Sequence, residues 1–160
     1  MQKRMFLLLM ILLTGCGAQE TFETVADELV LPAMAQPRFV CVDLPGETAM
    51  PVIENDHGRI YVCNDYEILL QTVESGDLEE TVQMISGLSE KDITMLGTGS
   101  EDVRRYEFVW ASAGEGGDKA GRAVILDDGN YHYCLSVLRN TDREKTQVNW
   151  DQVFSSFQLA

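Results

Sequence analysis

The Asp128-Gly129 dipeptide between two strand-like runs constrains the fold of this chain most. Residues 122–127 and 130–138 on either side of it are rich in apolar and β-branched residues, and Asp-Gly favours the two-residue type I′ turn of a β-hairpin. The register that such a turn predicts pairs Leu126 with Tyr131, Val124 with Tyr133 and Ala123 with Cys134. Apolar residues occupy both alternating faces of this hairpin. We therefore expect the hairpin in an antiparallel sheet that is covered on both sides.

Further strands precede the hairpin. Tyr106, Phe108 and Trp110 alternate on one face of a predicted strand. Trp110, and Trp150 near the C-terminus, are expected to be buried because each lies on the apolar face of a predicted element. Other alternating or β-branched segments predict strands over 38–44, 59–63, 66–73 and 92–96, with a turn at 97–100 and a flexible glycine-rich connector at 114–121.

Two helices are predicted, one in the middle of the chain and one at its end. Asp77 is suited to be a helix N-cap, Glu80 follows three residues later as in a capping box, and Gly87 is placed to end the helix. Residues 148–157 carry apolar side chains at helical spacing, with the last of them extended. The element order predicts a single α+β domain over residues 38–160, an antiparallel sheet flanked by helices.

This order of elements resembles the PsbP-like family. The resemblance rests on an early strand that ends in Leu44-Pro45-Gly46, on the mid-chain helix, and on the closing segment 150–157. It covers residues 39–159. It implies a PsbP-like sandwich and an accessory, non-enzymatic role, as in the extrinsic photosystem protein and in bacterial lipoproteins that share the fold. It supplies no functional residue that can be carried over to this chain.

The N-terminus has the pattern of an exported lipoprotein. Two basic residues precede the nine apolar residues 5–13, a run too short to span a bilayer, which takes about 20 residues. Residues 13–16, Leu-Thr-Gly-Cys, then resemble the bacterial lipobox. The resemblance implies that residues 1–15 are removed as a signal peptide and that Cys16 is acylated. We therefore expect the protein outside the cytoplasm, anchored to a bacterial membrane through this lipid.

Residues 16–37 are expected to be the lipidated cysteine and a tether to the domain. Apolar side chains recur there at helical spacing, at Phe22, Val25, Ala26, Leu29 and Val30. Because isolated helices this short rarely hold in water, we expect a marginal helix that is frayed or lies loosely on the domain. The alternative is a docking segment for a partner.

Composition and motifs argue against several functions. The chain has 26 Asp and Glu against 12 Lys and Arg, a formal net charge of −14, which disfavours nucleic acid as a partner. It lacks a recognisable nucleophile–base pair and any cofactor motif. His57, with Glu54 and Asp56 beside it, is expected in a solvated turn. His132 is expected to be a packed strand residue that shares a face with Cys134 but lacks a third zinc ligand. We therefore expect no enzyme, no cofactor and no metal site.

Three cysteines remain after Cys16. Cys41 and Cys63 lie on successive predicted strands, each beside valines expected to face the core, so both are predicted to point to the opposite face. If these strands are direct neighbours, the two cysteines can form a disulfide. A pairing with Cys134 and three buried thiols are the alternatives that the sequence leaves open.

These patterns indicate a lipid-anchored lipoprotein outside the cytoplasm that acts as a non-catalytic binding or accessory module, with a protein partner in the cell envelope. The alternative is a lipoprotein that binds a small ligand or a cation and serves a transporter or sensor. A concave pocket with converging polar groups would favour the ligand. A broad exposed apolar patch would favour the protein partner.

Overall fold

The computed structural model describes residues 35–160 except 47, 49, 115–116 and 141–147. The predicted signal peptide, Cys16 and the tether up to residue 34, including its helical stripe, lie outside the described residues. Residues 35–160 form one compact unit. Within the described part of the chain, no helix is long and apolar enough to cross a membrane.

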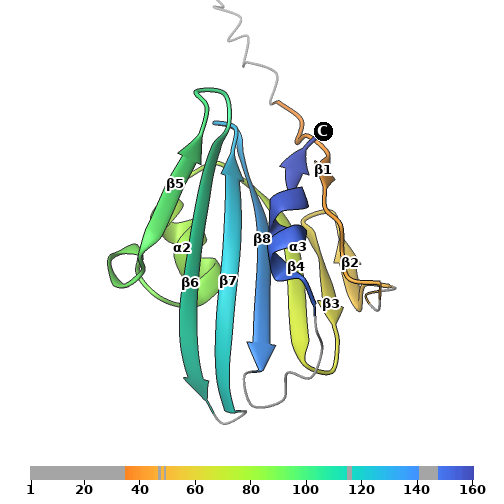
Figure 1. The fold of residues 1–160 in the computed structure, drawn as a ribbon. Helices are drawn as coiled ribbons and strands as arrows, with labels where there is room; N and C mark the ends of the chain where they lie inside the picture. The colour runs from red at the N-terminus through yellow and green to blue at the C-terminus, as the bar shows by residue number, and fades with distance from the viewer. Residues whose placement is uncertain (1–34, 47, 49, 115–116, 141–147) are drawn as a thin grey trace, which may run out of the picture. The chain divides into compact units, whose positions relative to one another are not determined.

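A seven-stranded antiparallel sheet, in the order β2-β3-β4-β8-β7-β6-β5, forms the body of this unit (Figure 1). After β4 the chain crosses to the far edge of the sheet, and β5 to β8 then return as a meander. A separate two-stranded ribbon pairs β1 with β9. The strands are β1 (Val40–Cys41), β2 (Ile53–Asn55), β3 (Gly58–Val62), β4 (Tyr66–Glu74), β5 (Met95–Gly99), β6 (Arg104–Gly114), β7 (Gly117–Asp127), β8 (Tyr131–Asn140) and β9 (Gln158–Leu159).

Two α-helices lie on opposite sides of the sheet (Figure 1). They are α2 (Leu78–Ser86), which is followed by the 3-10 turn η1 (Glu90–Asp92), and α3 (Trp150–Ser156). The predicted ends of α2 are confirmed: the Asp77 side chain accepts a hydrogen bond from the Glu79 N–H, and Gly87 closes the helix at φ 74°. The predicted C-terminal helix is also confirmed, with Asn149 as its cap and β9 extended beyond it.

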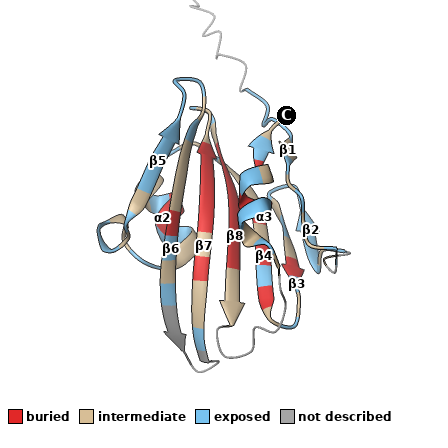
Figure 2. Ribbon diagram, in the orientation of Figure 1, coloured by how far each residue is buried: buried red, intermediate tan, exposed pale blue. Residues whose placement is uncertain are grey.

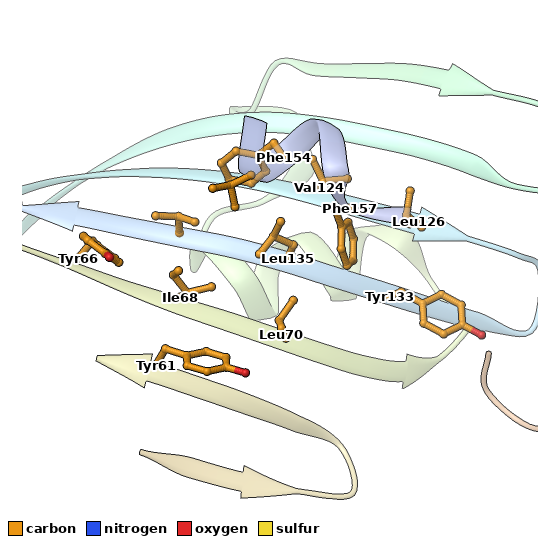
Figure 3. Packing of buried hydrophobic residues seen from close by; sticks show 12 residues of the cluster. Tyr61, Tyr66, Ile68, Leu70, Val124, Leu126, Tyr133, Leu135, Phe154 and Phe157 are labelled. Carbon is orange, nitrogen blue, oxygen red and sulfur yellow. The ribbon is translucent and has the colours of Figure 1, made fainter. Parts of the chain in front are cut away.

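Each helix covers its own apolar cluster, so the prediction of an α+β fold with both sheet faces covered is confirmed. β7 and β8 carry buried residues along much of their length (Figure 2). On one face, α3 places Phe154 and Phe157 against Val124 and Leu135 (Figure 3). On the other face, α2 packs Val82 against the β6–β8 side chains Phe108, Ala123, Ile125 and Cys134.

The hairpin register differs from the prediction by two residues. The observed pairs are Asp127 with His132, Leu126 with Tyr133, Ile125 with Cys134 and Val124 with Leu135. A type I′ turn needs positive φ at both central residues, and only Gly129 adopts it, at 84°. Instead, the Asp128 carboxylate accepts hydrogen bonds from the Asn130 and Tyr131 N–H groups and stabilises a wider loop. Because the shift is even, every side chain keeps its predicted face.

Several strand boundaries were also predicted wrongly. Within 38–44 only Val40–Cys41 is a strand, and β2 was not predicted. Both glycines of the turn predicted at 97–100 lie in β5, and most of the predicted connector 114–121 belongs to β6 and β7. Cross-strand pairing overrides the weak strand propensity of glycine in these segments. Both tryptophans are half-buried rather than buried, although Tyr106, Phe108 and Trp110 share the α2 face as predicted.

Candidate functional site

The structure offers two surfaces on which a function can be built. One is a cleft of about 720 Å³ along α3, which we call the α3 cleft. The other is an apolar surface beside α2 on the opposite face of the sheet. The first matches the kind of site expected for a small ligand, and the second the kind expected for a protein partner.

In the α3 cleft, the Arg105 side chain is occupied at all three nitrogens. Its Nε donates to Glu107 Oε1 at 2.7 Å. Its Nη1 and Nη2 donate to the carbonyl oxygens of Phe157 and Phe154, at 3.1 Å and 2.8 Å. These carbonyls lie at the C-terminal end of α3, where helix carbonyls need donors and a cation is favourable. Arg105 therefore holds the end of α3 against the sheet.

Arg122 binds the other end of the same helix. Its Nη1 donates to Asp151 Oδ1 at 2.7 Å, and its Nη2 lies 3.4 Å from Glu107 Oε2. The guanidinium carbon lies 4.4 Å from the centre of the Phe154 ring, a cation–π contact. Asp151, Arg122, Glu107 and Arg105 thus form a continuous ionic chain along α3, which latches the helix to the sheet and leaves little of its charge free for a ligand.

A buried polar cluster surrounds His132 on the α2 face. His132 is 2% exposed, and its Nδ1 lies 2.7 Å from Thr81 Oγ1. Its Nε2 lies 3.4 Å from Ser75 Oγ and 3.9 Å from Asp127 Oδ1. Burial lowers the pKa of His132, against the smaller opposing effects of Asp127 and Asp128.

The geometry of this cluster is not that of a nucleophilic triad. In such a triad the serine and the carboxylate contact opposite ring nitrogens of the histidine. Here Ser75 and Asp127 both lie at Nε2, and Thr81 occupies Nδ1. The cluster joins α2 and the loop before it to β7 and β8, so His132 is a packed strand residue, as predicted.

The remaining predicted polar sites are explained by local structure. His57 is exposed in the turn between β2 and β3, where Asn55 Oδ1 accepts hydrogen bonds from the His57 and Gly58 N–H groups. Glu54 pairs with Arg59 at 2.6 Å. Across the residues that the structure describes, no group of three His, Cys, Asp or Glu side chains is placed to hold a metal ion.

The strand adjacency behind the Cys41–Cys63 disulfide is wrong. Cys41 lies in β1, opposite Gln158 of β9, whereas Cys63 follows β3, whose neighbours are β2 and β4. The core-facing side chain of β3 is Tyr61, not its neighbours Ile60 and Val62, so Cys63 packs against the α3 cluster rather than away from it. All three thiols are free, and Cys134 is buried on the α2 face, where burial raises its pKa to about 12.

The apolar surface beside α2 is formed by side chains of five strands, β2, β3, β4, β6 and β8, and of the helix. We call it the α2 patch, and it consists of Ile53, Ile60, Val62, Leu69, Ile85, Trp110 and Leu138. Ile53, Ile60 and Leu69 are successive cross-strand partners and therefore share one face. Ile53 is 52% exposed and Val62 54%, values unlike those of core residues.

A hollow of about 240 Å³ lies within the α2 patch. Its apolar lining includes Ile60, Leu69, Ile85 and Trp110, and α2 covers only the part of the sheet beyond it. Glu67, the acidic residue in the lining, lies 3.8 Å from Lys119. This patch was not predicted from the sequence, because β2, which supplies Ile53, was not predicted and the alternation in β3 predicted that Ile60 and Val62 face the core. Apolar residues on both faces of β3 are the signal that points to it.

No protein-family model matches this chain, and no curated protein matches it. The candidate sites therefore depend on the geometry of the α3 cleft and the α2 patch.

Proposed function

We propose that this chain is a lipid-anchored lipoprotein outside the cytoplasm, and that its domain is a non-catalytic module that binds a protein partner in the cell envelope. The observation that carries the binding role is the α2 patch, an apolar surface with a hollow that a single side chain of a partner can fill. Exposed apolar surfaces of this kind are typical of protein-binding sites. Anchor side chains in central pockets provide much of the binding energy at such interfaces.

We also propose that the domain is a PsbP-like sandwich. An antiparallel sheet with one helix on each face has the layers that the family resemblance implies. The resemblance also implies an accessory, non-enzymatic role, which we propose for this domain.

The binding role is tested by photocrosslinking in the native membrane. A photoreactive residue at Val62, in the α2 patch, should crosslink one discrete protein, and the second change Ile53→Glu, at another exposed patch residue, should remove that product. The matched control carries the same group at Phe39, which is more exposed, at 85%, but lies outside the patch. Equal products from both positions, or a product at Val62 that survives Ile53→Glu, would contradict the proposal.

The anchor is tested separately. Cys16→Ala should abolish labelling by a fatty-acid probe and release or stall the protein, because the acyl chains attach to that thiol. Undiminished labelling of this variant would show that the lipobox resemblance had misled us. A Cys41→Ala variant should label like the natural chain.

A small acidic ligand in the α3 cleft is a second candidate. The cleft volume lies in the range of roughly 300–1,000 Å³ that is typical of ligand pockets. Arg105 and Arg122 pair with Glu107 and Asp151 in its lining, so the third arginine there, Arg38, leaves one net positive charge. That sign disfavours a cation. Millimolar citrate should raise the melting temperature above that in sodium chloride of equal ionic strength, and equal melting temperatures would remove this candidate.

A further inference from the structure

The two edges of the large sheet differ in their protection. Edge strands expose unpaired backbone groups, and proteins usually blunt them with short length, proline or charge. The β2 edge has each of these features: the strand is only three residues long, Pro51 lies shortly before it, and Glu54 and Arg59 form an ion pair. The β5 edge, Met95–Gly99, is five residues long and contains neither a charge nor a proline. No strand pairs with its outer side within the described part of the chain.

The register shows which backbone groups of β5 point outward. The Ser100 N–H donates to the Val103 carbonyl, which makes Ser100–Val103 a hydrogen-bonded pair. Such pairs alternate along an antiparallel ladder, so Leu96 and Thr98 direct their N–H and C=O groups to β6. Met95 and Gly97 therefore direct theirs to the open edge. At Gly97 no side chain obstructs the approach of another strand.

The two faces of this edge offer different chemistry. On the α3 face, Leu96 is 63% exposed and Val109 of β6 is 65% exposed. On the α2 face, β5 has no side chain at Gly97 or Gly99. The Tyr106 ring of β6 lies beside Gly97, 3.7 Å from the position that a Cβ atom would take there. Gly99 has φ 113°, which favours glycine.

Arg104 provides a positive charge near the bare face. It is exposed and lies opposite Gly99 of β5, with Asp127 of β7 as its cross-strand neighbour on the other side. A strand added beside β5 would lie about 10 Å from β6, two strand spacings away. Because Gly99 places no side chain in between, the extended Arg104 and a carboxylate on the added strand can meet over β5.

We propose that β5 accepts an added strand from a partner protein, an extended segment with apolar side chains toward Leu96 and Val109 and an acidic side chain toward Arg104. Backbone hydrogen bonds to the open edge would provide affinity, and the alternating side chains would provide specificity. A second copy that pairs through its own β5 is a poor occupant, because that strand has no acidic side chain to meet Arg104. This site lies at the opposite edge of the sheet from β2 and does not depend on the α2 patch.

The probe is a capped heptapeptide, Thr-Val-Glu-Val-Glu-Val-Thr, whose valines and glutamates lie on opposite faces when it is extended. Its control replaces both glutamates by lysine. With the full chain in detergent, the glutamate peptide should slow deuterium exchange at the Gly97 amide and leave Leu96 and Thr98, which already bond to β6, unchanged. Unchanged exchange at Gly97, or equal protection by both peptides, would overturn the proposal.

Two substitutions at one glycine separate the edge from the fold. Gly97→Pro removes the outward N–H but no bond to β6, so it should abolish binding. Gly97→Ala keeps the N–H, and its Cβ would make only an ordinary contact with Tyr106, so it should bind like the natural chain. Binding that survives Gly97→Pro would contradict strand addition.

Arg104→Glu tests the charge independently of the proline substitution. It should weaken binding of the glutamate peptide about fivefold, as expected for an exposed charge pair. The lysine peptide should then bind more tightly than the glutamate peptide. If Arg104→Glu left the preference unchanged, the proposed partner chemistry would be wrong. Sedimentation that showed a dimer, dissociated by Gly97→Pro, would overturn the proposal in favour of a second copy. None of these measurements involves the α2 patch, so their failure is distinct from a failure of the proposed function.

Discussion

Gly121 of β7 is the position where one added methyl group should have the clearest effect. It lies directly opposite Trp110 of β6, and the indole ring lies over it. A Cβ atom at Gly121 would overlap three ring atoms, so Gly121→Ala forces the indole to move. Forced repacking of this kind costs about 1–3 kcal/mol. Trp110 also lines the hollow of the α2 patch, so the change should disturb that surface too.

Gly97→Ala is the matched control for this prediction. Gly97 and Gly121 both lie in strands and neither has positive φ, so alanine gains about 0.4–1 kcal/mol at either site by restricting the unfolded chain. At Gly97 the new Cβ would lie 3.7 Å from Tyr106, an ordinary contact. The difference in unfolding free energy between the two variants therefore isolates the overpacking cost, with Gly121→Ala less stable by about 1–3 kcal/mol.

Urea titration followed by far-ultraviolet circular dichroism measures this difference, since a single domain of this size usually unfolds in two states. A double-mutant cycle locates its cause. In a Trp110→Leu background, Gly121→Ala should lose most of its effect, because the clashing ring is gone. A difference between Gly121→Ala and Gly97→Ala below about 0.5 kcal/mol, or an unchanged effect without Trp110, would refute the stacking argument.

Three further predictions concern the core. Trp150→Ala should lower the unfolding free energy by less than the roughly 3–5 kcal/mol expected for Phe154→Ala. Trp150 is half-buried, with its ring edge-on to Tyr66 at 4.9 Å between centroids, whereas Phe154 is only 1% exposed. Equal losses of unfolding free energy in urea titration would contradict this prediction. Burial lowers the pKa of His132 below 6.5, so the contribution of His132 to stability should be complete above pH 6.5 and should be lost as the pH falls through the folded-state pKa. His132→Gln should remove that part of the pH dependence of the unfolding free energy. Identical pH profiles for the variant and the natural chain would refute this prediction. Alkylation of unreduced protein should modify Cys134 only after unfolding, because burial raises the pKa of this thiol to about 12. Rapid labelling of Cys134 in the folded state would argue against that burial.

Features set by neighbours along the chain could be predicted from the sequence. The Asp77 cap and the Gly87 end of α2 depend on hydrogen bonds within one or two turns, and both are as expected. The aromatic alternation through Phe108 fixed the face of β6, since side chains in a strand alternate whatever the partner strand is. The C-terminal helix also followed from its apolar spacing.

Features set by distant segments could not be predicted in this way. Alternation predicts the face of a residue but not its partner, so a register wrong by two residues fits the same pattern as the observed hairpin. Cys41 and Cys63 were expected to be neighbours because their strands are successive, but β1 pairs with β9 from the other end of the chain. The α2 patch and the open β5 edge likewise arise from strand order.

Local patterns along the chain were therefore enough to predict the types of the principal elements, the caps of the central helix and the apolar character of both faces of the β7–β8 hairpin. The strand order, the pairing of β1 with β9 and the exposure of particular apolar side chains became known only from the folded chain. This division follows from the range of the interactions. Caps and alternation act between residues close in the chain, whereas Ile53 and Val62 are exposed because α2 packs over β6 to β8 and stops short of them.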